Sequence, residues 1–327
     1  MSKISVIIVN YLAADLAIEA VESVLERDHG GRNVEVHLLD NASPGGSDAA
    51  ILGRKCEELD VPARLTFHPE TINHGFGRGN NLIVERLAPS SDLVDYVLLL
   101  NPDARLKNET VDILASFLDE NPNVAVAGAR IEKPDTGPVT AAFRFPGIVS
   151  TFAGALAFGP VSRLTSRWRV ALPPETPTGR VDWVAGAAVM IRLSAFRAVG
   201  GFDPDYFLYY EEVDLMRRLG VEGWETWHVA EAEAIHAEGV STGVKSGETA
   251  RRRRPAYWYE SWRLYFIKNH GRAYASVAAL SWLAGAALNH AIARARGKQP
   301  AAPLRFFGDF WAMAARPILG LEAKPYE

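Results

Sequence analysis

The chain has 327 residues with a formal net charge of -4, and 48% of them are hydrophobic and 23% charged. This composition excludes a disordered chain, and the negative balance argues against a general nucleic-acid binder despite four consecutive arginines at 251–254. One cysteine, Cys56, cannot form an internal disulfide and fits a reducing compartment. The apolar run Ile4–Val9 is shorter than a signal-peptide core, and no small-residue cleavage site follows it. We therefore expect the main domain to be cytoplasmic.

Short apolar runs that alternate with helical patterns predict a parallel β-sheet. The four expected strands are Ile4–Val9, Val34–Leu39, Arg64–Phe67 and Tyr96–Leu100. Helices of about three turns between them imply right-handed βαβ crossovers, so the expected fold class is α/β with a mostly parallel central sheet flanked by helices. The carboxyl ends of parallel strands meet at one edge of a sheet. That edge should hold Asn10, Asp40, His68 and Asp103.

The sequence Asn101-Pro102-Asp103 ends the fourth predicted strand with a stiff turn. Proline lacks a backbone N–H and restricts the residue before it, so the strand stops and presents Asp103 at the edge of the sheet. A carboxylate there suits a hard divalent cation that completes its coordination with substrate phosphates. The competing interpretation is that Asp103 caps the helix expected to begin near residues 108–110. These residues alone leave both interpretations open.

Residues 73–81, Asn-His-Gly-Phe-Gly-Arg-Gly-Asn-Asn, form a glycine-rich connection after the third predicted strand. Its glycines allow the backbone to approach a ligand closely, and the helix that follows offers free N–H groups to an anion. A dinucleotide-binding fingerprint fails on spacing, because Asn80 stands where a third glycine is required and the segment does not follow the first strand. A glycine-rich connection without a ligand is the alternative.

Residues 110–199 combine regular elements with a long proline-rich stretch. A helix at Thr110–Glu120 leads to a strand at Val124–Ala129. Residues 133–181 contain seven prolines, which predicts long loops and short elements, and such a stretch inside a compact domain is usually functional. Strand character returns at 182–191, and Ser194 is expected to cap a short helix that reaches Val199.

Three carboxylates stand at the start of a predicted helix: Glu211, Glu212 and Asp214. The helix dipole explains them in part, because it favours acidic residues in a first turn. Aromatic residues at 206, 207, 209 and 210 precede them, and a carboxylate in such surroundings would have a raised pKa suited to a general base. Strand patterns at 225–229 and 232–235 then end at His236, a second candidate contact for a metal or a diphosphate.

The composition changes after Gly271. Ala273–Ala293 contains no Asp, Glu, Lys or Arg, and its length just reaches that of a membrane span although its hydrophobicity is weak. Apolar residues then recur at helical spacing between Leu304 and Ala314. Three interpretations stay open for this part: helices that lie on a membrane surface, helices that cover the core, and a contact between the copies of a homodimer.

In their order along the chain, these segments resemble the inverting, nucleotide-sugar-dependent glycosyltransferases of the GT-A fold. The likeness covers residues 4–270 and is greatest with the large second family and its rhamnosyltransferase-like branch. Ser5–Tyr11 looks like the opening strand of that family, and Leu39–Ser43 looks like the turn that binds base and ribose. Asn73–Asn81 is similar to the segment that packs around the donor.

Three later segments extend the resemblance. Asn101–Asp103 stands where the family has its D-x-D motif, and Glu211–Leu215 stands where it has E-D-x-D-L. Residues 236–241 are similar to the histidine segment that closes over the diphosphate. Asn101 replaces the first Asp of D-x-D, and Glu212 replaces the commoner Asp, which shifts the base by roughly 1 Å. Both variants are marks of the rhamnosyltransferase-like branch.

The resemblance implies a role for each matching residue. Asp103 and His236 would bind the metal, and Glu212 would be the catalytic base. The residues implied around the donor are Asn10, Tyr11, Asp40, Asn73, Gly75, Phe76, Gly77, Asn80, Asn81 and Asn101. Those implied around the acceptor are Asp182, Trp183, Gly186, Tyr210 and Glu211. Asp40 is the expected partner of the pyrimidine.

The implied reaction is a direct displacement with inversion at the anomeric carbon, assisted by Mg²⁺ or Mn²⁺. The expected donor is dTDP-L-rhamnose, and the expected acceptor is a hydroxyl of a glycan or of a polyprenyl-diphosphate-linked saccharide used for cell-surface polysaccharide. The alternatives are another UDP- or GDP-sugar donor on the same fold, and a sugar nucleotidylyltransferase. The latter requires a glycine-rich, basic loop directly after the first strand, and residues 10–15 supply neither glycine nor a basic residue.

The resemblance also implies a division of the chain. Residues 1–270 would be the glycosyltransferase domain, with a nucleotide-binding half to about residue 130 and an acceptor-binding half after it. Residues 271–327 would be a helical extension. If that extension binds a membrane, the enzyme is peripheral on the cytoplasmic face of the inner membrane.

Overall fold

The computed structural model describes residues 2–87, 94–237 and 252–322, so residues 238–241 of the histidine segment lie outside the described residues. Contacts group the chain into two compact units. The first unit consists of Met1–Phe143, Ala171–Pro204 and Leu215–Ser246. The second unit consists of Arg144–Val170, Asp205–Asp214 and Gly247–Glu327. The chain therefore passes between the units several times instead of completing one before it starts the other.

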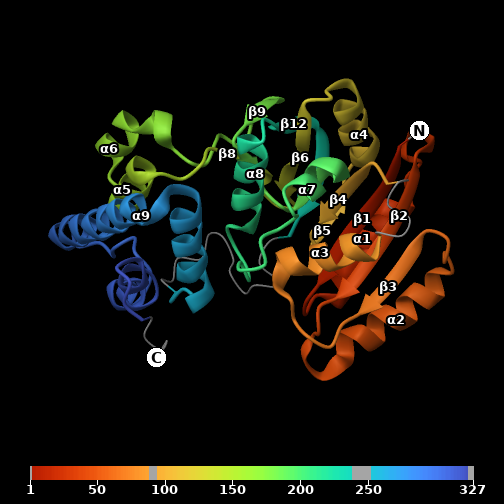
Figure 1. The fold of residues 1–327 in the computed structure, drawn as a ribbon, viewed down its shortest axis with the longest axis horizontal. Helices are drawn as coiled ribbons and strands as arrows, with labels where there is room; N and C mark the ends of the chain where they lie inside the picture. The colour runs from red at the N-terminus through yellow and green to blue at the C-terminus, as the bar shows by residue number, and fades with distance from the viewer. Residues whose placement is uncertain (1, 88–93, 238–251, 323–327) are drawn as a thin grey trace. The chain divides into compact units, whose positions relative to one another are not determined.

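The first unit is built on a large sheet with the strand order β3-β2-β1-β4-β11-β6-β12-β5 (Figure 1). The strands are β1 Lys3–Asn10, β2 Asn33–Asp40, β3 Leu65–Pro69, β4 Tyr96–Leu100, β5 Ala104–Leu106, β6 Val124–Lys133, β7 Gly137–Val139, β9 Gly179–Val181, β11 Ala188–Arg192 and β12 Glu225–His236. β7 pairs with β6 and β9 with β12, whereas β8 Ala142–Phe143 and β10 Trp183–Val184 form a separate pair. Strands β1 to β4 run parallel, and β11 is antiparallel to both β4 and β6. The expected mostly parallel sheet is confirmed.

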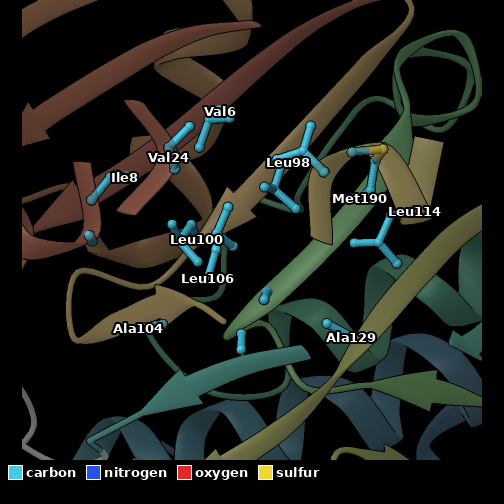
Figure 2. Packing of buried hydrophobic residues seen from close by; sticks show 14 of the residues in the cluster. Val6, Ile8, Val24, Leu98, Leu100, Ala104, Leu106, Leu114, Ala129 and Met190 are labelled. Carbon is cyan, nitrogen blue, oxygen red and sulfur yellow. The ribbon is translucent and has the colours of Figure 1, made fainter. Parts of the chain in front are cut away.

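Strands β1 and β4 are buried on both faces, which explains why nearly all of their residues are apolar. The even-numbered residues Val6, Ile8, Leu98 and Leu100 belong to one hydrophobic cluster, together with Val24 of helix α1 (Figure 2). Their odd-numbered neighbours belong to a second cluster. Successive side chains of a strand point to opposite faces, so a slip of one residue would exchange the two sets. Burial on both sides therefore fixes the register of the strands that lead to the site.

The helices of the first unit are α1 Ala14–Leu25, α2 Ser47–Leu59, α3 Gly75–Arg86, α4 Thr110–Glu120 and α7 Leu193–Ala198, with short turns η1 His29–Gly31 and η2 Pro44–Gly46. Helix α8 Glu211–Val221 begins in the second unit and ends in the first. The prediction that Ser194 caps α7 is wrong, because the helix begins one residue earlier and no side chain caps it. The N–H of Leu193 is satisfied instead by the carbonyl of Asp95, at 2.9 Å.

Two strand predictions are also corrected. The pattern at 182–191 is interrupted, because β10 pairs with β8 and only Ala188–Arg192 enters the large sheet. The patterns at 225–229 and 232–235 are one strand, β12, whose pairing with β6 shifts register between Val229 and Glu233. Such a bulge adds residues on one strand only, which explains why the apolar alternation breaks there.

The second unit is helical. Its elements are α5 Ile148–Leu156, α6 Gly159–Leu164, η4 Ser166–Trp168, α9 Ala256–Ala295, α10 Phe306–Phe310, η5 Trp311–Ala315 and α11 Arg316–Ile318. Helix α9 has 40 residues but is broken at Gly271, where φ is 80° and ψ is 164°. The break lies at the boundary expected at residues 270–271, but both segments of α9 belong to the second unit, so the expected division of the chain stays a prediction.

The second segment of α9 packs closely against α5 (Figure 1). An added Cβ at Gly285 would lie 2.6 Å from the carbonyl oxygen of Phe152, so this approach requires glycine. Asn289 Nδ2 donates to the carbonyl of Leu156 at 2.9 Å. By length and composition, α9 is the one helix in the described part of the chain that could cross a membrane, and 33% of its apolar window is buried inside the protein.

Candidate active site

The order of the strands reverses beside β1. The chain runs outward from β1 to β2 and β3, and then places β4 on the opposite side of β1. In open α/β sheets, ligands bind at the carboxyl ends of the strands where such a reversal occurs. Asn10 ends β1, and Asn101 follows β4 directly. Both predicted donor-binding residues therefore lie at the topological switch point.

Asp103 and His236 are in contact although 133 positions separate them in the sequence. His236 Nε2 lies 2.9 Å from Asp103 Oδ1, and Asn101 Nδ2 lies 3.3 Å from the same ring nitrogen. The antiparallel pairing of β5 with β12 builds this contact, because it sets His236 opposite Ala104. The N–H of Ala237 also donates to the carbonyl of Asp103, at 3.0 Å. The structure thus brings the two predicted metal ligands together.

The interpretation of Asp103 as a helix cap is wrong. Helix α4 begins at Thr110, seven residues after Asp103, and no side chain caps its first turn. Asp103 instead has 8% of its surface exposed and pairs with His236. Its carboxylate therefore belongs to the edge of the sheet and not to the start of α4.

The groups around Asp103 fit a divalent cation that arrives with its substrate. Asp103, His236 and Asn101 offer carboxylate, imidazole and amide donors within contact of one another. In the described ranges, no group of three His, Cys, Asp or Glu side chains could hold a metal ion. Mg²⁺ and Mn²⁺ commonly take further ligands from phosphates and water. The donor set thus suits a cation shared with a diphosphate better than a closed all-protein site.

A buried polar network fixes the ends of β1 and β2. Asn10 Nδ2 donates to Asp40 Oδ1 at 2.9 Å and to Asp48 Oδ2 at 3.2 Å. Ser43 Oγ donates to Asp40 Oδ1 at 2.7 Å, and the N–H of Ala14 donates to Asp48 at 3.2 Å. Asn10 and Asp40 are 0% and 1% exposed, so both side chains hold the loops that follow their strands. Contact of Asp40 with a pyrimidine stays a prediction.

The backbone after both strands adopts the same uncommon conformation. Leu12 and Ala42, each two residues beyond a strand end, have φ of 57°. A non-glycine residue in this left-handed region costs about 1–2 kcal/mol. Tyr11, a predicted donor contact, precedes Leu12 and is partly exposed. Strain of this kind is concentrated at functional sites, and here it marks the edge where the donor is predicted.

Much of the glycine-rich stretch is helical. Helix α3 begins at Gly75, so Phe76, Gly77, Gly79 and Asn80 lie in its first turns. An added Cβ at Gly79 would lie 3.1 Å from Val9 Cγ1, so this glycine lets the helix approach β1. Helix packing therefore accounts for one glycine that the sequence suggested for a ligand.

Asparagine side chains tie the start of α3 to the end of β2. Asn41 Oδ1 accepts from the N–H of His74 at 2.9 Å, and Asn41 Nδ2 donates to Asn73 Oδ1 at 3.1 Å. Asn73 Oδ1 also accepts from the N–H of Gly75 at 2.8 Å. Sequence reasoning missed Asn41, although its position in the turn after Asp40 was an available signal.

Asn80 and Asn81 have different surroundings. Asn81 Nδ2 donates to the carbonyl of Phe202 at 2.8 Å, and its Oδ1 accepts from the N–H of the same residue at 3.0 Å. Asn80 Nδ2 donates to the carbonyl of Phe76, whereas its Oδ1 is buried with no partner among the residues that the structure describes. Asn80 can still accept a hydrogen bond, whereas the amide of Asn81 is committed to the fold.

The predicted acceptor residues of the first unit lie in and beside β10. An added Cβ at Gly186 would lie 3.6 Å from the ring of Phe76, so predicted donor and acceptor residues are neighbours here. Trp183 stacks on Phe143 with ring centroids 3.9 Å apart and an interplanar angle of 10°. Asp182 is exposed.

Tyr210, Glu211 and Glu212 belong to the second unit. Tyr209 and Tyr210 have φ of 67° and 68°, a conformation that two successive non-glycine residues rarely share. Helix α8 begins directly after them. This strained turn leads into the first turn of α8, where Glu211 is only 3% exposed.

Burial dominates the electrostatics of this carboxylate pair. The Oε2 atoms of Glu211 and Glu212 have no hydrogen-bond partner within the described parts of the chain. Burial raises the pKa of Glu212, and burial together with the Glu212 charge raises the pKa of Glu211 well above its ordinary value. Burial also raises the pKa of Tyr210. A carboxylate with a raised pKa is a stronger base than an ordinary one, which suits general base catalysis.

Two family models match the chain. The model described as Glycosyl transferase family group 2 matches residues 96–314, more than half of the chain, and Glycosyl transferase family 2 matches residues 5–157. The chain belongs to glycosyltransferase family 2. Asp103 lies inside both matched ranges, and Glu212 and His236 lie inside the first.

Relatives of this family 2 glycosyltransferase include rhamnosyltransferases. It is 31% identical over 222 residues to N-acetylglucosaminyl-diphospho-decaprenol L-rhamnosyltransferase of Mycobacterium tuberculosis. The matched segment covers 65% of this chain and 69% of the relative. It is 27% identical over 222 residues to rhamnosyltransferase WbbL of Escherichia coli, covering 64% of this chain and 80% of the relative. These likenesses place it in the rhamnosyltransferase-like branch.

Solved structures share the fold of the glycosyltransferase. GalNAc-T7 with UDP, GalNAc and Mn²⁺ matches with a TM-score of 0.59 and 13% identity, over 98% of this chain and 56% of that one. Mannosyltransferase PcManGT from Pyrobaculum calidifontis, in complex with GDP-Man and Mn²⁺, matches with a TM-score of 0.54 and 19% identity. The match covers 97% of this chain and 82% of the mannosyltransferase chain. The GT-A fold expected from the motifs is confirmed.

In this glycosyltransferase, the first segment of α9 holds the 205–214 stretch at three points. The polar contacts are Ser261 Oγ to the Leu208 carbonyl at 2.9 Å, Lys268 Nζ to Asp205 at 2.7 Å, and Asn269 Nδ2 to Asp214 Oδ1 at 2.8 Å. Tyr206 also reaches Asp214 Oδ1, at 3.3 Å. Asp214 thus anchors the first turn of α8. Sequence reasoning missed Asn269, because 55 positions separate it from Asp214 and no local pattern links them.

Proposed function

We propose that this glycosyltransferase transfers L-rhamnose from dTDP-L-rhamnose to a hydroxyl group of a lipid-linked saccharide, with inversion and with a divalent cation. The observation that carries the proposal is the 2.9 Å contact of His236 with Asp103 at the carboxyl edge of the sheet. Such a pair suits the cation that accompanies a nucleoside diphosphate. The two rhamnosyltransferase relatives support the sugar, and the Mn²⁺ in the two solved structures supports the cation.

On the donor side, the chain's own residues bind and orient the nucleotide sugar. Asp103 and His236, with Asn101 beside them, would hold the cation, which supplies positive charge against the leaving diphosphate. The hydrogen-bonded networks after β1 and β2 hold the surrounding loops in place before the donor arrives. Groups that are already in place need little reorganisation during the reaction.

On the acceptor side, Glu212 would take the proton of the attacking hydroxyl. As that oxygen bonds to the anomeric carbon, the bond from this carbon to the diphosphate oxygen breaks, and the proton passes to the carboxylate. Attack from the face opposite the leaving group inverts the configuration, so no carboxylate nucleophile is required. Burial raises the pKa of both Glu211 and Glu212, and the charge of Glu212 adds to the rise at Glu211, so the pair resists carrying two negative charges at once.

The acceptor class is proposed from a relative. The protein of Mycobacterium tuberculosis is named for an N-acetylglucosaminyl-diphospho-decaprenol acceptor. A saccharide linked through diphosphate to a polyprenol is therefore the acceptor that we propose here, for the synthesis of a cell-surface polysaccharide.

Calorimetry of purified protein with dTDP-L-rhamnose, UDP-glucose and GDP-mannose tests the donor. Each donor is titrated with Mn²⁺, with Mg²⁺ and with EDTA, and the tightest binding is expected for dTDP-L-rhamnose with a cation. Tighter binding and faster turnover with a UDP- or GDP-sugar would reject the donor. Equal activity in EDTA would reject the cation, and a product of retained configuration by NMR would reject the direct displacement.

A further inference from the structure

The second segment of α9 exposes a continuous apolar stripe. Between residues 273 and 293, the exposed residues are Ala273, Val277, Leu280, Ala284, Ala287, Leu288 and Ala291. These seven residues, the α9 stripe, recur at three- and four-residue intervals and so lie along one side of the helix. Val277, Leu280 and Leu288 are 49%, 66% and 49% exposed. A row of large apolar side chains that is this exposed is unusual on a protein surface that binds neither another molecule nor a membrane.

The polar side chains of the same segment bond inside the protein. Ser276, Ser281, Asn289 and His290 all contact backbone carbonyls. Ser281 and Asn289 reach α5, through the carbonyls of Ile148 and Leu156. Crossing a bilayer would require α9 to leave these contacts and the close approach at Gly285. The stripe can instead be covered while α9 lies along a surface.

A second group of exposed apolar side chains lies at residues 304–311, in and beside α10. The ring of Phe307 lies 5.2 Å from that of His290, measured between centroids. Leu304, Phe307 and Trp311 are 46%, 39% and 46% exposed. An aromatic pair beside an aliphatic stripe is typical of side chains that settle at a membrane interface.

The second unit is basic although the whole chain is acidic. It contains seventeen Lys and Arg and nine Asp and Glu, a formal charge of +8, whereas the chain as a whole carries -4. Exposed basic residues bracket the α9 stripe, with Arg272 before it and Arg294, Arg296 and Lys298 after it. Basic residues at a surface are attracted to anionic lipids.

We propose that the α9 stripe, with the exposed apolar side chains of Leu304, Phe307 and Trp311, docks in the plane of an anionic phospholipid bilayer. A second copy of the chain fits less well, because two units of charge +8 would repel each other. Helices that pair with a second copy usually carry charged residues that set their register, and the sequence between 273 and 293 contains no Asp, Glu, Lys or Arg. This inference rests on the second unit alone and holds for any donor sugar.

Co-sedimentation of the full chain with vesicles tests the proposal. Vesicles of phosphatidylcholine with phosphatidylglycerol are compared with vesicles of phosphatidylcholine alone. The wild type should bind the anionic vesicles more tightly, and Leu280→Gln with Leu288→Gln should weaken that binding on the order of tenfold or more. The matched control is Ile72→Gln with Val221→Gln, at residues 64% and 77% exposed in the first unit, and it should bind as the wild type does.

Three results would overturn the proposal. The stripe variant could bind anionic vesicles as the wild type does, or the wild type could bind neutral and anionic vesicles equally. Sedimentation velocity could also show a wild-type dimer that the stripe variant abolishes, which would assign the stripe to a second copy. Circular dichroism confirms that the variants are folded. Transfer to a water-soluble acceptor, measured with the stripe variant, separates failure of docking from failure of the proposed reaction.

Discussion

Replacing Glu212 by Gln should abolish activity and stabilise the protein at the same time. The Glu212 carboxylate stands in the first turn of α8, its Oε2 has no partner within the described residues, and burial raises its pKa. Stability from the neutral carboxyl group is fully present below the ordinary pKa of 4.5 and is lost as the pH rises through the raised pKa of the folded state. Glutamine cannot ionise, so the variant avoids this loss.

The two effects can be given magnitudes. A pKa raised by one unit corresponds to about 1.4 kcal/mol of unfolding free energy above that pKa. For a domain of this size, each kcal/mol moves the melting temperature by about 2–4 °C. Loss of a general base lowers kcat by roughly 10² to 10⁴, which is about 3–5 kcal/mol of transition-state stabilisation. Donor affinity should stay unchanged, because Glu212 acts on the acceptor.

The assay combines single-turnover transfer with thermal unfolding at pH 5 and pH 8. The variant should melt at a higher temperature than the wild type at pH 8, with a smaller difference at pH 5. Glu211→Gln is the matched control, and it should gain stability at pH 8 and act on acceptor affinity, while its transfer rate at saturating acceptor stays near that of the wild type. A Glu212→Gln enzyme that transfers sugar at nearly the wild-type rate, beside a folded but inactive Glu211→Gln enzyme, would refute the assignment. A lower melting temperature at pH 8 would refute the electrostatic argument.

Asp103→Asn should abolish Mn²⁺-dependent donor binding in calorimetry and His236→Gln should weaken it roughly tenfold or more, because the two side chains lie 2.9 Å apart and would hold one cation in the proposed function. Metal-stimulated activity near wild type in Asp103→Asn would contradict this. Asn269→Leu removes a donor to a buried carboxylate, so unfolding free energy should fall by about 1.5–3 kcal/mol and kcat should fall more than KM changes. A kcat near wild type in Asn269→Gln would support the role of Asn269 in positioning the first turn of α8 through Asp214. An unchanged kcat in Asn269→Leu would exclude that role. Gly285→Ala should destabilise the second unit by about 1–3 kcal/mol in chemical denaturation, because the new Cβ would lie 2.6 Å from a backbone oxygen of α5. Ala284→Ser, at the exposed neighbouring position, is its control, and equal stability of the two variants would exclude tight packing.

The elements that could be predicted are those whose signal is local. Strands β1 and β4 are mostly apolar because both of their faces are buried, and Pro102 ends β4 within the same short segment. Asp103 was therefore placed at the correct edge of the sheet from neighbouring residues alone. The glycines after β3 were harder to interpret, because Gly79 packs on Val9 of a distant strand.

The contacts that could not be predicted depend on pairings between distant segments. The sequence put Asp103 and His236 at strand ends, but the pairing of β5 with β12 sets their distance. Asn269 was missed because its partner Asp214 comes from another element, 55 positions away. Asn81 shows the opposite outcome. It was predicted to contact the donor, but its side-chain amide bonds the backbone of Phe202 and so stabilises the fold.

The pairing of β5 with β12 also has a consequence for how the protein folds. β5 has three residues, and its partner is the last strand that the structure describes. A growing chain therefore has β1 to β4 and Asp103 long before His236 is synthesised. Pairings between such distant segments form late, because the intervening chain must first be ordered. Under the proposed function, a cation and a nucleotide bind only the completed sheet, so the substrate should act as a folding ligand that draws the final step toward the native state.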